Sequence, residues 1–173
     1  MLNEKVENAL NEQINAELWS AYLYLSMSMN FQAKGLSGIA NWFYIQFREE
    51  QDHARIFMNY INRRGGRVRL APIAGVDTEW DRPIDAFAAT LAHEQKVTAM
   101  INNLYALAAS ENDYATCDQL KWFVSEQVEE EETAQGYIDK LTLVGDNGMG
   151  IYMLDQELGA RVYNTPAPLA TAE

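Results

Sequence analysis

The chain of 173 residues contains a single cysteine, Cys117, and only four prolines. One cysteine excludes an intrachain disulfide and a zinc site built from several thiolates. The prolines, at positions 72, 83, 166 and 168, leave two long stretches in which helices can run uninterrupted. Basic residues are also scarce, with 13 Lys and Arg against 25 Asp and Glu, so the net charge is −12. This charge argues against nucleic acid or an anionic membrane as a partner. It suits metal cations, basic partners or simply a well-solvated surface.

Long apolar runs are absent as well. No segment approaches the length of a membrane-spanning helix, so we expect no membrane partner. The N-terminus, MLNEKVENALNEQ, lacks the basic region and apolar run of a secretion signal, so we expect a cytoplasmic location. The content of hydrophobic residues (48%) and charged residues (22%) is typical of a globular domain. The length suits one domain with a sizeable core.

The positions of glycine, proline and capping residues divide the chain into helices. Gly35 can close a first helix, Ser37 can cap a second, Pro83 suits the start of a third, and Asn112 or Asp113 can cap a fourth. We expect helices over about 3–34, 37–64, 83–110, 113–144 and 151–158, in one domain over 1–160 with a flexible tail at 161–173. The segment between the second and third helices is long enough to run the length of a bundle. The prediction is an all-α four-helix bundle with one long crossover and a short C-terminal fifth helix.

Each of the four long helices has an apolar face with residues spaced alternately by three and four. Each face is interrupted near the middle of its helix by acidic, amide or histidine side chains. If the helices pack in register, these side chains meet at one level of the core: Glu17, Glu50, His53, Glu94, Gln127 and Glu130. Any one of them alone is more simply a surface residue or a hydrogen-bonded core residue.

Several carboxylates meeting in an apolar interior need compensation. Unpaired, each would cost several kcal/mol to desolvate or would become protonated. No lysine or arginine lies near this level on the apolar faces. Two divalent cations would balance four carboxylates, and oxygen ligands with one imidazole favour iron or manganese. The pattern therefore predicts a site for two metal ions.

These motifs together resemble the bacterial non-haem ferritins, members of the ferritin-like di-iron carboxylate family whose bundle pattern is well known. The resemblance covers nearly the whole chain and rests on NEQINAE, REEQDHA, a glutamate in the third helix, and VSEQVEEE. It implies that Glu17 and His53 hold one iron and that Glu50 bridges to a second, which Glu94 and Glu130 also bind. Gln127 would be a weak ligand or would support the ligands.

The same resemblance implies an iron-storage role. Fe(II) would be oxidised by O2 or peroxide to ferric oxyhydroxide, and the mineral would collect in a hollow shell, expected to be a 24-mer. Gln127-x-x-Glu130 stands where bacterioferritins and many di-iron oxygenases carry a second Glu-x-x-His motif, so the second iron lacks an imidazole and we expect it to be held more loosely. Position 52 is Asp and not the methionine by which bacterioferritins hold haem, so no haem is expected. The fifth helix either helps to close the shell or packs on its own bundle.

Other residues near this level are assigned on weaker grounds. The resemblance suggests a third iron site formed by Glu49, Glu126 and Glu129, although residues 128–132 also suit a solvated acidic face. Tyr24 lies two turns from Glu17 and would hydrogen-bond a ligand, donate an electron or simply pack in the core. The remaining assignments are core packing for Trp122, an exposed or interhelical position for His93, solvent or subunit contacts for Arg48, Gln51 and Asp52, and a possible ion-entry pore lined by Asp113 and Asp118.

Three other functions compete with iron storage. A rubrerythrin-type di-iron peroxidase is disfavoured because the chain lacks rubredoxin-type cysteine pairs. A DNA-protecting mini-ferritin is disfavoured because its ligands lie between subunits, whereas here they fall within one bundle. A purely structural helical bundle would bind no stoichiometric metal.

Overall fold

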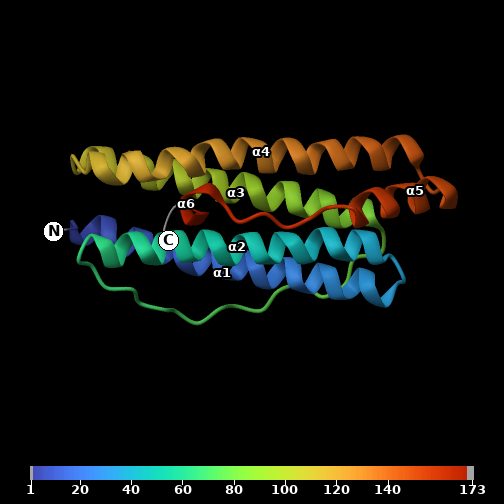
Figure 1. The fold of residues 1–173 in the computed structure, drawn as a ribbon, viewed down its shortest axis with the longest axis horizontal. Helices are drawn as coiled ribbons and strands as arrows, with labels where there is room; N and C mark the ends of the chain where they lie inside the picture. The colour runs from blue at the N-terminus through green and yellow to red at the C-terminus, as the bar shows by residue number, and fades with distance from the viewer. Residues whose placement is uncertain (1, 171–173) are drawn as a thin grey trace.

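The computed structural model describes residues 2–170, and the regular elements in that range are all helices. They are α1 (Glu4–Ala33), α2 (Ser37–Arg63), α3 (Pro83–Ser110), α4 (Tyr114–Val144), α5 (Gly148–Gly159) and α6 (Ala167–Ala170). The four long helices lie side by side as a bundle, with α5 at one end (Figure 1). The predicted fold class, a four-helix bundle with one long crossover and a short C-terminal helix, is confirmed. None of the described helices combines the length and the apolar character that crossing a membrane requires.

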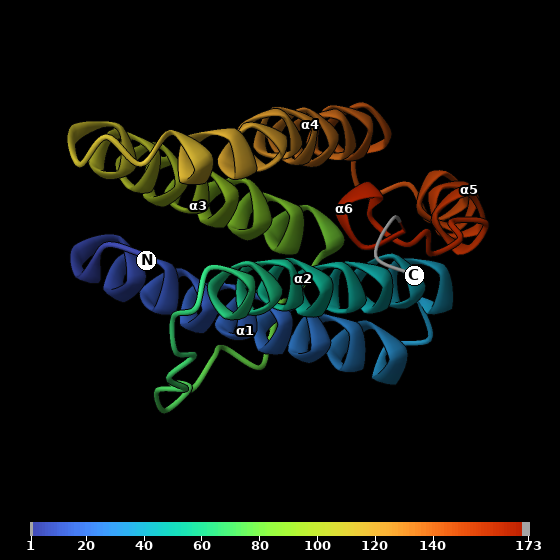
Figure 2. The ribbon, with the colours of Figure 1, turned by 60° about the vertical axis from the view of Figure 1, so that its left-hand side comes forward.

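The helices pack as two antiparallel pairs, α1 with α2 and α3 with α4, and the two pairs face each other (Figure 2). The crossover between α2 and α3 runs along the bundle beside α1 (Figure 1). Polar side chains of α1 fasten it. Asn11 Nδ2 donates to the carbonyl of Arg67 at 3.1 Å, and Asn11 Oδ1 accepts from the Arg69 N–H at 2.6 Å. Near the other end, Asn30 Nδ2 donates to the carbonyl of Trp80 at 3.1 Å. These bonds satisfy backbone N–H and C=O groups of the crossover, which lies outside any helix or sheet.

Most helix ends follow the local rules. Gly35 has a φ of 76° after α1, Pro83 is in the first turn of α3, and Asp113 caps α4 by accepting from the Thr116 N–H at 3.1 Å. Ser37, however, does not cap α2, because it is already the first helical residue. The preceding residue, Leu36, makes no side-chain cap bond.

The cap of α2 comes from α5 instead. Asp155 Oδ1 accepts from the backbone N–H groups of Gly38 and Ile39, at 2.9 Å each. A carboxylate at this position also complements the partial positive charge of a helix N-terminus. A Cβ on Gly38 would lie 1.6 Å from the Asp155 carbonyl oxygen, so the backbones of α2 and α5 are in direct contact. The fifth helix begins at Gly148, three residues earlier than expected, where Asn147 caps it.

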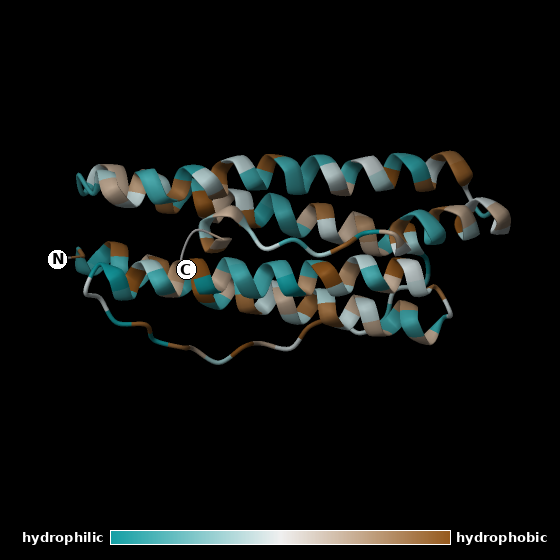
Figure 3. Ribbon diagram, in the orientation of Figure 1, coloured by the Kyte–Doolittle hydropathy of each residue, from teal (hydrophilic) through white to brown (hydrophobic). Residues whose placement is uncertain are grey.

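The core consists of two apolar clusters along the bundle axis. One cluster includes Leu10, Phe57 and Phe123, and the other includes Phe31 and Phe43. Polar and apolar residues alternate along all four long helices (Figure 3). Apart from Asn11 and Asp155, most of the buried acidic, amide and histidine side chains lie between the two clusters, near the middle of the four long helices. The interior is therefore apolar at both ends and polar at its centre.

Of the predicted flexible tail over 161–173, the structure describes 161–170 packed against the bundle, and residues 171–173 lie outside the described part. The Tyr163 hydroxyl donates to Asp52 Oδ2, and α6 places Leu169, 8% exposed, in the first apolar cluster. Asp52 is consequently buried and does not face solvent as expected, because the returning chain covers it. Arg48 remains exposed, with its guanidinium 3.7 Å from the Tyr163 ring centre.

Candidate metal centre

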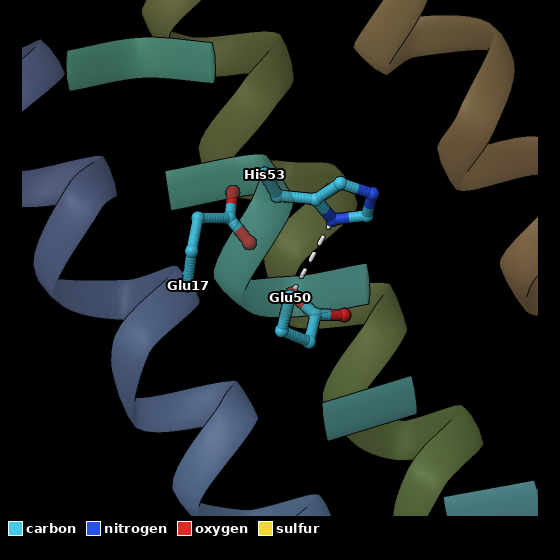
Figure 4. Close-up of side chains that lie close together, drawn as sticks. All are labelled: Glu17, Glu50 and His53. Atoms are coloured by element: carbon cyan, nitrogen blue, oxygen red, sulfur yellow. Dashed lines mark ion pairs between the residues drawn. The ribbon is translucent and has the colours of Figure 1, made fainter. Parts of the chain in front are cut away.

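Three of the predicted ligands gather at the centre of the bundle: Glu17 from α1, and Glu50 and His53 from α2 (Figure 4). Each residue is at most 2% exposed, and their candidate ligand atoms all lie within 4.8 Å of one another. Glu50 and His53 share a face of α2 because they are three residues apart. His53 Nδ1 lies 3.4 Å from Glu50 Oε2. Within residues 2–170 this is the one group of acidic, His or Cys side chains that meets this geometry.

Several atoms of this group lack hydrogen bonds. Glu17 Oε2, Glu50 Oε2 and His53 Nε2 are fully buried and have no partner among the described residues. Buried polar atoms are nearly always paired in folded proteins, because an unpaired one costs about 1–3 kcal/mol or more. Two unpaired carboxylate oxygens beside an imidazole are the donor set that a divalent cation requires. The residues present therefore fit a metal ion.

Buried amides hold the other carboxylate oxygens of the centre. Gln13 Nε2 donates to Glu17 Oε1 at 2.8 Å, and Gln46 Nε2 donates to Glu130 Oε2 at 2.9 Å. Each of these amides fixes the direction of one carboxylate. Sequence reasoning missed both as supporting residues, although Gln13 lies four residues before Glu17 and Gln46 four before Glu50, spacings that signal a shared helix face.

The remaining predicted residues, Glu94, Gln127, Glu130 and Tyr24, are buried at the same level. Gln127 Nε2 donates to Glu94 Oε2 at 3.1 Å, and the Tyr24 hydroxyl donates to Glu94 Oε1. These two carboxylates, Glu94 and Glu130, do not join the cluster of three, because their oxygens point to amide and hydroxyl donors. The arrangement is thus one compact set of ligands with two further carboxylates held beside it.

Burial and mutual repulsion disfavour ionisation of these groups. The pKa of Glu17 is raised well above its usual value by burial and by the charge of Glu50. Burial and the charge of Glu94 likewise raise the pKa of Glu50, and they raise that of Glu130 to about 8. Burial also raises the pKa of Tyr24, with Glu94 adding to the rise. A cation placed among these groups would restore their charged forms.

Aromatic rings form the walls of the centre. The His53 ring centre lies 5.5 Å from that of Trp122 and 5.7 Å from that of Phe123, both roughly edge to face. Tyr24 stacks on Phe43 with 6.2 Å between ring centres. Trp122 packs as expected, but its contact with His53 also fixes the plane of a candidate ligand.

The structure does not bring the proposed third group together in the same way. Glu49 is paired with Arg161, whose Nη2 lies 2.6 Å from Glu49 Oε2. Glu126 is half-buried and Glu129 is exposed. No sequence pattern pointed to Arg161, since its contact depends on how the chain returns after α5.

The structure also shows the positions of His93, Asp113 and Asp118. His93 is interhelical, with its Nε2 2.7 Å from Ser20 Oγ on α1. Asp113 caps α4 and pairs with Arg64 at 3.0 Å, so its carboxylate is held by structural contacts within the bundle. Asp118 pairs with Lys121 at 2.9 Å on the surface.

A four-helix bundle with carboxylates and a histidine converging from facing helices defines the class of carboxylate metal proteins. Comparisons with known proteins give the family. Residues 7–144 match the family described as "Ferritin-like domain". The chain therefore belongs to the ferritin family, in agreement with the resemblance found in its sequence.

Relatives named "Bacterial non-heme ferritin" match over almost the full length. The protein from Bacteroides fragilis is 47% identical over 161 residues, covering 93% of this chain and 100% of the relative. The protein from Staphylococcus epidermidis is 38% identical over 164 residues, covering 95% and 99%. Among solved structures, a "novel open pore ferritin" from Archaeoglobus fulgidus superposes with a TM-score of 0.93 at 44% identity, covering 94% of this chain and all of that one.

Proposed function

We propose that this protein is an iron-storage ferritin that oxidises Fe(II) at the centre of each bundle and deposits ferric mineral inside an oligomeric shell. The observation that carries the proposal is the gathering of Glu17, Glu50 and His53, with buried carboxylate oxygens that accept no hydrogen bond from any residue in the described range. The names of the relatives support iron as the metal.

Fe(II) is the substrate of this site. In this proposal Glu17, Glu50 and His53 bind one ion, and Glu50 shares its carboxylate with a second ion held by Glu94 and Glu130. Two adjacent Fe(II) ions can deliver two electrons to one O2 or peroxide molecule. In the net reaction, four Fe(II) with one O2 and six waters yield four FeOOH and eight protons. The carboxylates bind in their charged forms, so the site gives up protons as it fills.

The two positions differ in their ligands. The first has the imidazole of His53, whereas the second has only carboxylates and the amide of Gln127. Before Glu94 and Glu130 can bind metal, they must give up hydrogen bonds from Gln127 and Gln46. The second ion is therefore held more loosely, as suits a site that passes its oxidised product onward.

Storage requires a closed shell. The exposed apolar side chains of α5, Met149, Tyr152 and Met153, are each at least 59% exposed and offer a contact to neighbouring subunits. We propose a shell of 24 subunits. Size-exclusion chromatography should give an assembly of that mass. A monomer or dimer would remove the cavity, and iron oxidation without a shell would favour a rubrerythrin-type peroxidase.

Mixing the protein with Fe(II) in air tests the site. The near-ultraviolet absorbance of ferric iron should rise quickly, and Glu50→Ala or His53→Ala should slow the initial rate by at least about 10- to 100-fold, since losing even a group that supports a metal ligand has an effect of this size. The control is Glu12→Ala, which removes an exposed carboxylate of the same helix as Glu17. An unchanged initial rate in the Glu50 and His53 variants would show that oxidation occurs elsewhere.

A further inference from the structure

The chain that follows α5 turns back along α2, on the side that faces α4 (Figures 1 and 2). The side chain of Arg161, early in this segment, contacts two residues of α2. The guanidinium donates through Nη2 to Glu49 Oε2 at 2.6 Å and through Nη1 to the carbonyl of Trp42 at 3.3 Å. Its centre also lies 4.8 Å from the ring centre of Trp42. The side chains of Arg161 and Glu49 are 26% and 18% exposed, so the pair is largely removed from water.

The position of this segment is fixed on both sides of Arg161. Upstream, Asp155 holds α5 on the N-terminus of α2. At Arg161 itself, Asn41 Nδ2 donates to the backbone carbonyl at 3.1 Å. Downstream, Tyr163 bonds to Asp52 and lies under the guanidinium of Arg48. An arginine held in this way loses little freedom when it pairs, so the ion pair is stronger than a typical surface pair.

Glu49 directly precedes the candidate ligand Glu50 and borders the buried carboxylates. Its charge raises the pKa of Glu50 and of Glu130, after the larger effects of burial and of Glu94. The charge of Arg161 acts on Glu130 in the opposite direction. Arg161 is thus a cation supplied by the chain itself at the edge of the acidic centre.

We propose that Arg161 is a positioning residue that holds the carboxylate of Glu49 in an ion pair. It thereby limits metal binding to the inner ligands, which are Glu17, Glu50, His53, Glu94 and Glu130. A divalent cation bound by Glu49 would meet the guanidinium at close range, and like charges in a poorly hydrated site repel strongly. Glu49 therefore takes up metal only when the C-terminal segment moves Arg161 away. This inference rests on the proposed function, since it assumes that the inner ligands bind metal.

Among the described residues, Glu49 and Glu126 belong to no group of side chains with metal-ligating geometry, and the ion pair gives a reason for this. Burial raises the pKa of both carboxylates, and the charge of Arg161 opposes the rise at Glu49. With Arg161 in place, Glu49 is already neutralised. Without it, Glu49 and Glu126 would be two partly buried carboxylates with no cation between them.

The test is calorimetric titration of the metal-free, full-length protein with Zn2+, which binds without being oxidised. Wild type should bind two ions per chain, and Arg161→Gln should bind one more. Arg161→Gln combined with Glu49→Gln should return to the wild-type number. Arg48→Gln is the matched control. Arg48 also lies on α2 and contacts the C-terminal segment at Tyr163, but the ion-pair partner of Glu49 is Arg161. The Arg48→Gln variant should match wild type.

If Arg161→Gln binds no additional ion, the inference is overturned. A second variant keeps the test informative should Arg161→Gln fold poorly: Glu49→Gln alone should leave the wild-type number unchanged, and a loss of one ion would equally overturn the inference. Failure of the proposed function gives a different result. In that case Glu50→Ala and His53→Ala would bind as many ions as wild type.

Discussion

Glu130 provides the sharpest test of the electrostatics of the metal-free centre. Its carboxylate is buried, 8% exposed, and accepts a hydrogen bond from Gln46 at 2.9 Å. Burial and the charge of Glu94 raise its pKa from the ordinary 4.5 to about 8. Replacing Glu130 by Gln keeps the size of the side chain and an oxygen that accepts from Gln46, but it removes the titrating group.

The magnitude follows from linkage between protonation and folding. Each pKa unit corresponds to about 1.4 kcal/mol, so a rise from 4.5 to about 8 corresponds to about 5 kcal/mol. Because the folded-state pKa is the higher one, this stabilisation is fully present below pH 4.5, the pKa in the unfolded chain. It is lost as the pH rises toward about 8. The metal-free wild type should therefore become less stable by about 5 kcal/mol across this range through Glu130 alone.

Urea unfolding measures this effect in protein freed of metal and held at one concentration, since assembly also affects stability. The free energy of unfolding of wild type and Glu130→Gln should be compared at about pH 5 and about pH 8. The wild type should lose several kcal/mol more than the variant. Glu12→Gln, at an exposed position, should follow the wild type. Parallel pH profiles for wild type and Glu130→Gln would refute the assignment of Glu130 as a buried, largely protonated group.

Further changes test the packing around the centre. Asp155→Ala removes the cap of α2 and should lower the free energy of unfolding by about 1–2 kcal/mol in urea titrations; no loss would contradict the cap. Gly38→Ala places a Cβ 1.6 Å from the Asp155 carbonyl oxygen and should destabilise the fold. By contrast, Gly136→Ala lies inside α4 with nothing within 4 Å of the new Cβ, and it should stabilise the fold by up to about 1 kcal/mol. If both glycine variants changed the free energy of unfolding in the same direction, this reasoning would be contradicted. Tyr24→Phe removes the hydroxyl that holds Glu94 and should slow Fe(II) oxidation by about tenfold while Zn2+ stoichiometry stays the same; an unchanged rate would exclude a positioning role.

The level of the metal centre was predictable because helix packing is periodic. Residues three and four apart share a face, so Glu50 and His53 had to lie together if α2 packed as a core helix. The same spacing placed Glu17 and Glu94 on the inner faces of their helices. The burial of these residues follows from that regularity, and the family resemblance supplied the metal.

Contacts between distant segments could not be predicted in the same way. The cap of α2 by Asp155 joins residues 116 and 117 positions apart, and it depends on where α5 docks. The pairing of Arg161 with Glu49 and the burial of Asp52 depend on the path of the chain after α5, which has no periodic pattern. The amide bonds to carboxylates depend on rotamers, which spacing alone does not specify.

Anomalous X-ray diffraction from crystals of the protein soaked with Fe(II) under anaerobic conditions would show directly where iron binds. We expect an iron peak within bonding distance of Glu17, Glu50 and His53, and a second peak between Glu50 and the carboxylates of Glu94 and Glu130. With Arg161 in place, no peak should lie at Glu49. The absence of iron from the Glu17, Glu50 and His53 group would refute the proposed oxidation site.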